Sequence, residues 1–127
     1  MTPVARPLRY ALSHIWTRTE EDGTVTFGIT NYAQYELGEL QYIGLPHVGS
    51  AVKKDASFGE VESAKTVSDL YAPVSGEVVE VNESLTSSPE SVNDDAYGKG
   101  WMIKIKMSNP AEADALLDLA AYTATLD

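Results

Sequence analysis

Hydrophobic and polar residues alternate in short runs along most of the chain, and turn residues separate these runs. Such a period of two predicts β-strands with one buried face. The clearest run is 24–29 (TVTFGI), and the preceding residues 20–23 (EEDG) predict a hairpin turn that joins it to a strand at 15–19. Further strands are expected at 40–45, 58–62, 70–72, 77–81 and 101–106, the last with Met102, Lys104 and Lys106 on one face.

Helical signals are fewer and shorter. Asn31 followed by Gln34 has the pattern of an N-cap and its capping partner, and Gly38 predicts the end of that helix after about two turns. Residues 88–90 (SPE) indicate a second start, with proline in the first helical position. Residues 109–112 (NPAE) are the best helix start in the chain. Apolar residues follow it at helical spacing: Ala113, Leu116, Leu117, Ala120 and Ala124.

This order of elements predicts a mainly β protein with short helices. Many short strands separated by turns are typical of a sandwich or barrel, and we expect a C-terminal helix to pack its apolar stripe on the sheets. The 127 residues fit one domain, 1–127, that is large enough to bury a core without disulfides. The sequence contains no linker, low-complexity tract or second domain.

Composition narrows the possible chemistry. The chain contains no cysteine, which excludes disulfides, a thiol nucleophile and a thiolate metal site. Any redox chemistry must therefore come from an attached group. The two histidines lie far apart in the sequence, so a metal cluster is not expected. There is also no nucleophile–base pair of recognisable spacing and no phosphate-binding loop, which argues against an enzyme.

The formal net charge is −10, which disfavours binding to nucleic acid or to an anionic membrane. Two interpretations stay open: the charge serves solubility, or it provides a docking surface for basic partner proteins. No apolar run approaches the ~20 residues of a membrane span. Residues 1–6 show no apolar secretion segment, and we expect a cytoplasmic protein.

Lys65 lies in the segment 61–69 (VESAKTVSD), between two predicted strands. A lysine in a turn is ordinarily a solvated surface charge. Here the surrounding motifs are those of glycine cleavage system H proteins, which the chain resembles from Tyr10 to Tyr122. The matching motifs occur in order at residues 28–30 (GIT), 33–34 (AQ), 37–38 (LG), 45–46 (LP), 48–49 (VG), 62–63 (ES), 68–69 (SD), 73–82 (PVSGEVVEVN), 88–90 (SPE), 92–93 (VN), 97–98 (YG) and 100–101 (GW).

The resemblance implies a barrel-sandwich hybrid of the lipoyl-domain kind, and it implies that Lys65 is amide-linked to lipoate. The lipoyl group would supply the redox sulfur that the cysteine-free chain lacks, and acylation would remove the charge of the lysine. An arm of roughly a dozen bonds raises the local concentration of dithiolane at a docked partner to about the millimolar range. The chain itself would be a non-catalytic carrier.

Through the resemblance, four other residues are expected to serve recognition or to line the arm: Glu62, Ser63, Asp69 and His14. Glu62 and Ser63 precede the lysine, where Glu62 would be recognised by the lipoylating enzyme. Asp69 aligns with the acidic residue that helps to hold the amine of the aminomethyl intermediate. His14 lies in the segment that resembles the family's His-Glu-Trp motif. The alternatives are solvated charges at the hairpin and N-terminal packing for His14.

Ile15 departs from the family, because the middle residue of that motif is usually a glutamate that also binds the amine. Loss of such a charge-assisted hydrogen bond costs about 1.5–3 kcal/mol. Two hypotheses therefore stay open. The chain is an H-like lipoate-binding protein that serves a heterodisulfide-reductase-like complex in sulfur oxidation, or it is a glycine cleavage H protein that serves glycine decarboxylase and aminomethyltransferase.

Both hypotheses share two kinds of partner. One is a lipoate ligase or the lipoyl synthesis enzymes, which would load the lysine. The other is dihydrolipoamide dehydrogenase, which would reoxidise the arm. A protein that is not itself a carrier, or that relays lipoyl groups to other carriers, is a further alternative. The presence of lipoate on Lys65 in protein from its own host separates these cases.

Overall fold

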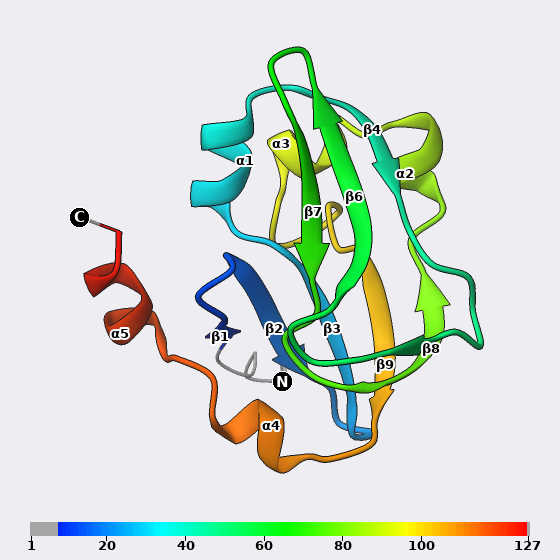
Figure 1. The fold of residues 1–127 in the computed structure, drawn as a ribbon, viewed down its shortest axis with the longest axis vertical. Helices are drawn as coiled ribbons and strands as arrows, with labels where there is room; N and C mark the ends of the chain where they lie inside the picture. The colour runs from blue at the N-terminus through cyan, green and yellow to red at the C-terminus, as the bar shows by residue number, and fades with distance from the viewer. Residues whose placement is uncertain (1–7, 127) are drawn as a thin grey trace, which may run out of the picture.

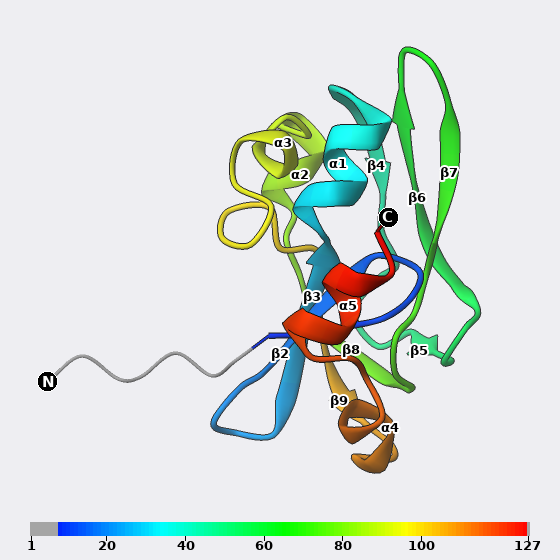
Figure 2. The ribbon, with the colours of Figure 1, turned by 90° about the vertical axis from the view of Figure 1, so that its left-hand side faces the viewer.

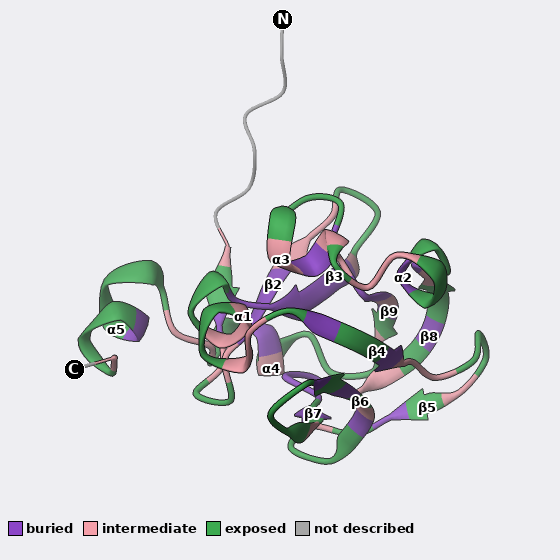
Figure 3. Ribbon diagram, turned by 90° about the horizontal axis from the view of Figure 1, so that it is seen from above, coloured by how far each residue is buried: buried purple, intermediate pink, exposed green. Residues whose placement is uncertain are grey.

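The computed structural model describes residues 8–126; the segment 1–6, expected to lack a secretion signal, lies outside the described residues. Two antiparallel sheets lie against each other (Figures 1 and 3). The six-stranded sheet has the order β1 (Arg9–Tyr10), β2 (Ile15–Thr19), β3 (Thr24–Ile29), β9 (Ile103–Met107), β8 (Gly76–Val81) and β5 (Ala51–Val52). The three-stranded sheet has the order β4 (Leu40–Gly44), β6 (Ser57–Ser63) and β7 (Val67–Tyr71).

The expected fold class, mainly β with short helices in a barrel-sandwich arrangement, is confirmed. The strands predicted at 15–19 and 24–29 coincide with β2 and β3 at both ends. Their turn forms as expected: Gly23 N donates to Glu20 O at 3.0 Å, and Gly23 adopts φ +88°. The remaining predicted strands shift at their ends by up to three residues.

The alternation predicts Met102 on the same face as Lys104 and Lys106. This prediction is wrong, because Met102 is fully buried. β9 begins only at Ile103, and the period of two applies only within the strand. Met102 N instead donates to Phe27 O at 3.0 Å and its side chain joins the core. Within β9 the alternation holds, since Ile103 and Ile105 are buried while Lys106 is exposed.

The core lies between the two sheets, where the buried residues in Figure 3 gather. Phe27 of β3 and Phe58 of β6 meet edge to face across it, with ring centroids 5.1 Å apart. A second, smaller cluster joins the N-terminal strands to the C-terminal helix and consists of Tyr10, Trp16 and Tyr122. Tyr10 and Tyr122 stack at 4.8 Å with nearly parallel rings.

The helices are α1 (Asn31–Leu37), α2 (Ser84–Ser87), α3 (Ser91–Asp94), α4 (Ala111–Asp114) and α5 (Leu119–Ala124). The expected N-cap Asn31 is wrong by one residue. Thr30 is the cap, and its Oγ1 accepts a hydrogen bond from Ala33 N at 3.2 Å. Gly38 ends α1 as predicted. The helix start expected at 88–90 forms a turn, and α3 begins directly after it. The sequence pattern does not predict α2.

The apolar stripe from Ala113 to Ala124 does not form one helix. Leu117 pairs with Tyr10 through two backbone hydrogen bonds of 2.8 Å, and this bridge interrupts the helix. Asp118, in an extended conformation, then caps α5 by accepting from Ala121 N at 2.8 Å. The predicted C-terminal helix is therefore two short helices. Figure 2 shows α5 lying in front of β2 and β3, with α4 below it.

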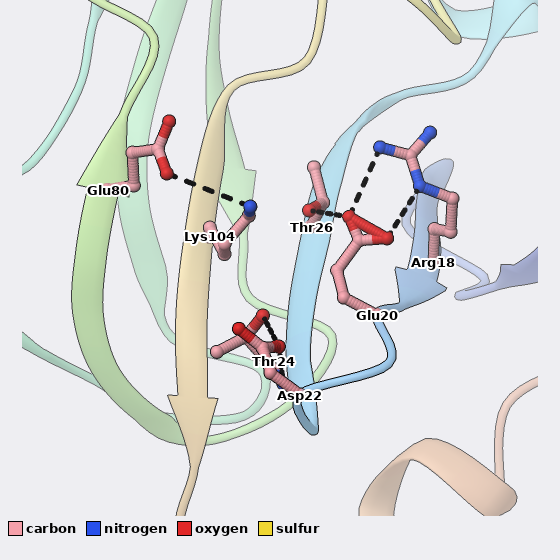
Figure 4. A network of polar contacts seen from close by, with 7 residues as sticks. All are labelled: Arg18, Glu20, Asp22, Thr24, Thr26, Glu80 and Lys104. Carbon is pink, nitrogen blue, oxygen red and sulfur yellow. Dashed lines mark hydrogen bonds and ion pairs between the residues drawn. The ribbon is translucent and has the colours of Figure 1, made fainter.

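Polar contacts hold the β2–β3 hairpin and the neighbouring strands at the end of the molecule opposite the β6–β7 loop (Figures 1 and 4). Arg18 Nε donates to Glu20 Oε1 at 3.1 Å, and Thr26 Oγ1 donates to Glu20 Oε2 at 3.0 Å. Burial alone would raise the pKa of Glu20, but the hydrogen bonds from Arg18 and Thr26 and the charge of Arg18 lower it overall. Among the described residues no helix is long and apolar enough to cross a membrane.

Candidate functional site

Lys65 lies at the tip of the β6–β7 hairpin, which projects beyond the other elements in Figures 1 and 2. The strand pairing extends up to Glu62 and Val67. Ser63 N then donates to Thr66 O at 2.9 Å and closes a short loop around the lysine. Lys65 is exposed. The backbone of the site is thus fixed by a sheet, while its amine is accessible from solvent.

The side chain of Lys65 extends toward the end of α1. A Cβ atom built on Gly38 would lie 3.8 Å from Lys65 Cε. Gly38 has φ +83° and ψ −166°, a conformation that is essentially restricted to glycine. The residue that ends α1 is therefore also a neighbour of the lysine stem. An open groove of about 560 Å³ begins beside it and is lined by Gln34, Tyr35, Gly38, Glu39, Glu90, Asn93 and Asp94.

Asn93 of α3 holds the segment between α1 and β4 in place. Its Nδ2 donates to Gly38 O and to Gln34 Oε1, both at 2.9 Å. Its Oδ1 accepts from Leu40 N at 2.9 Å. Leu40 in turn pairs with Ser63 at the base of the lysine loop. One amide side chain therefore links α1, α3 and β4 beneath the hairpin, a role that the 92–93 motif alone does not indicate.

Ser63 is buried, and its Oγ accepts a long hydrogen bond of 3.4 Å from Lys65 N. Its position favours support of the loop over contact with a lipoyl arm. Glu62 is exposed on the outer face of the three-stranded sheet, opposite Val67. Asp69 is exposed on the same sheet, opposite Glu60. The structure therefore brings Glu62, Ser63 and Asp69 onto one hairpin with Lys65.

His14 lies at the junction of α1 and α5. Its Nδ1 is 2.7 Å from Tyr122 Oη, and its ring centroid is 4.9 Å from that of Tyr32. Burial lowers the pKa of His14, and the nearby carboxylate of Glu36 opposes this shift. No hydrogen bond or aromatic contact joins His14 to the hairpin within residues 8–126. The packing role for His14 thus has direct structural support.

Tyr122 extends this junction to the N-terminus of α1, because its hydroxyl also lies 2.8 Å from Thr30 Oγ1. The neighbours of His14 in its motif are packing residues here. Ile15 is buried in the core opposite Ile29, and Trp16 is fully buried with Nε1 donating to Ala96 O at 2.9 Å. A buried isoleucine offers no polar contact to an amine, as the sequence predicts.

Comparison with known proteins gives one consistent result. The family model described as "Glycine cleavage H-protein" matches residues 8–127. The glycine cleavage system H protein of Opitutus terrae is 54% identical over 122 residues, 96% of each chain. That of Symbiobacterium thermophilum is 52% identical over 124 residues, 98% of this chain and 96% of the relative.

A solved structure of a glycine cleavage system H protein from Mycobacterium marinum superimposes with a TM-score of 0.86. It is 38% identical, and the match covers 96% of this chain and 98% of the other. H proteins of this family are non-catalytic carriers with a lipoate covalently attached to a lysine. The chain belongs to the glycine cleavage H-protein family and is a lipoyl carrier.

Proposed function

We propose that Lys65 is the lipoylated residue and that the protein carries the aminomethyl group from glycine decarboxylase to aminomethyltransferase. Dihydrolipoamide dehydrogenase would then reoxidise the arm. The observation that carries this proposal is the exposed lysine in a short loop between two hydrogen-bonded strands. When attached, lipoate supplies reversible dithiol–disulfide chemistry at the end of a flexible tether.

The residues around Lys65 suit this task. The Ser63–Thr66 hydrogen bond and the pairing of Ser63 with Leu40 fix the point from which the arm starts. The exposed amine admits a lipoate ligase or the lipoyl synthesis enzymes. Acylation removes the ammonium charge, so the stem that extends toward Gly38 becomes largely apolar. Recognition by the ligase through Glu62 and contact of the amine with Asp69 stay predictions.

Identity to the relatives named above supports glycine as the source of the carried group, since they match nearly the full chain and bear the glycine cleavage name. The sulfur-oxidation hypothesis, with its heterodisulfide-reductase-like complex, depends on Ile15. The structure gives Ile15 a separate explanation, because its side chain is part of the hydrophobic core opposite Ile29. We therefore favour the aminomethyl carrier.

A glycine–bicarbonate exchange assay tests this proposal. The lipoylated protein is mixed with glycine decarboxylase, glycine and labelled bicarbonate, and incorporation of label into glycine is measured. We expect exchange with the wild type and none with Lys65→Arg. Lys99→Arg, which changes another exposed lysine in the same way, should keep the exchange. Fully lipoylated wild-type protein that supports no exchange would overturn the glycine assignment.

A further inference from the structure

The outer face of the three-stranded sheet carries an unusual set of side chains. Strand register places Tyr42, Glu62 and Val67 in one row across β4, β6 and β7. The next row holds Glu60 directly opposite Asp69. All five side chains are exposed, and Tyr42 and Val67 keep 50% and 60% of their surface in contact with solvent. The face therefore combines carboxylates with exposed apolar groups.

The three carboxylates have no cationic partner within the described residues. The ion pairs there are Arg18–Glu20 and Lys104–Glu80, both on the other sheet. Lys65 is the only lysine or arginine in residues 40–44 and 57–71, which form the three strands and the hairpin loop. Lipoylation removes that charge as well. The modified hairpin thus presents uncompensated negative charge on the outer face of the strands that carry the arm.

This arrangement opposes folding. Like charges directly opposite each other on neighbouring strands destabilise a sheet, and Glu60 faces Asp69 in this way. Beside them, Tyr42 and Val67 leave 50% and 60% of their surface exposed, so the fold buries only part of their apolar area. This face lowers stability, and it lies on the hairpin whose arm enters another protein. Contact with that partner protein explains why such a face is present. Charge complementarity then specifies a basic partner surface.

We propose that the outer face of β4, β6 and β7 docks against lysine and arginine residues around the active-site entrance of glycine decarboxylase, the enzyme that transfers the aminomethyl group to the lipoylated arm. This inference rests on the proposed function, because it requires the Lys65-linked arm to enter that enzyme. Tyr42 and Val67 provide apolar contact at the centre, and Glu60, Glu62 and Asp69 guide the approach. Docking strengthens when Lys65 is acylated, because its positive charge disappears.

The test measures the Michaelis constant of glycine decarboxylase for lipoylated carrier in glycine–bicarbonate exchange, at several salt concentrations. Glu60→Lys reverses one charge at the face and places a cation beside Asp69, so it does not weaken the fold. Glu21→Lys makes the same change of net charge at the exposed turn of the β2–β3 hairpin and is the matched control. Intact mass confirms equal lipoylation of all samples.

We expect Glu60→Lys to raise this constant about tenfold at low salt, with a difference that shrinks as salt increases. Glu21→Lys should change it less than about twofold. Equal constants for the two variants, with an active wild type, would overturn the docking surface alone. A wild type without exchange would overturn the proposed function, and the docking surface with it.

Discussion

Asn93→Ala removes the amide that joins α1, α3 and β4 beneath the lysine loop. In the wild type, Leu40 N donates to Asn93 Oδ1 and Gly38 O accepts from Asn93 Nδ2, both at 2.9 Å. Alanine removes both partners. Leu40 is 2% exposed, so its amide would stay dry. Gly38 and Gln34 are half-buried and regain part of their hydration.

An unpaired buried backbone group costs about 1–3 kcal/mol. Leu40 N should incur this full cost, and the partly hydrated Gly38 O should incur less. We therefore expect Asn93→Ala to lower the free energy of unfolding by about 2–4 kcal/mol. That loss is a large fraction of the total stability of a typical domain, about 5–15 kcal/mol. The pairing of Leu40 with Ser63 should loosen as well, and amide hydrogen exchange in residues 61–63 should accelerate.

Urea unfolding followed by circular dichroism measures the change as a lower midpoint with an unchanged slope. Asn31→Ala is the control, because Asn31 is exposed and, among residues 8–126, its Oδ1 accepts only from Gln34 Nε2. It should stay within about 0.5 kcal/mol of the wild type. If Asn93→Ala is as stable as that control, Asn93 does not support the loop in the way described.

Three further predictions concern neighbouring features. Gly38→Ala should lose about 1–3 kcal/mol in urea unfolding through backbone strain at φ +83°, since its nearest neighbour leaves room for a methyl group; unchanged stability would refute the strain. The pKa of His14 is lowered by burial below 6.5, so the unfolded chain binds the proton first and stability should fall as pH drops below about 6.5. His14→Asn, which tolerates the left-handed backbone, should flatten that dependence in thermal melts from pH 7.5 to 5; an unchanged slope would assign it elsewhere. Glu60→Lys should raise stability by about 0.2–1 kcal/mol by pairing with Asp69, and a loss in urea unfolding would contradict the repulsion inferred there.

Strand positions follow from the sequence where alternating apolar and polar residues are combined with a clear turn motif. The 15–19 and 24–29 strands were placed to the residue because the EEDG turn fixes their register. The C-terminal helix was misjudged because its interruption comes from pairing of Leu117 with Tyr10, at the other end of the chain. No local period encodes such a contact.

The same distinction explains the caps and the site. Thr30 and Asn31 are both good capping residues, and the local pattern does not contain the long-range contact of Thr30 Oγ1, which lies 2.8 Å from the hydroxyl of Tyr122. The resemblance of the whole chain to the H-protein family singles out Lys65. The alternation of apolar and polar residues only places this lysine between two strands. The bridging role of Asn93 and the outer acidic face depend on register between strands, which the pattern of single strands does not contain.

Peptide mass mapping of the protein purified from its own host tests the proposed carrier site most directly. Proteolysis followed by fragmentation assigns any added mass to a single residue. We predict one lipoyl group on the peptide that contains Lys65 and an unmodified peptide around Lys99. A free amine at Lys65 in host protein, or lipoate on another lysine, would contradict the proposal.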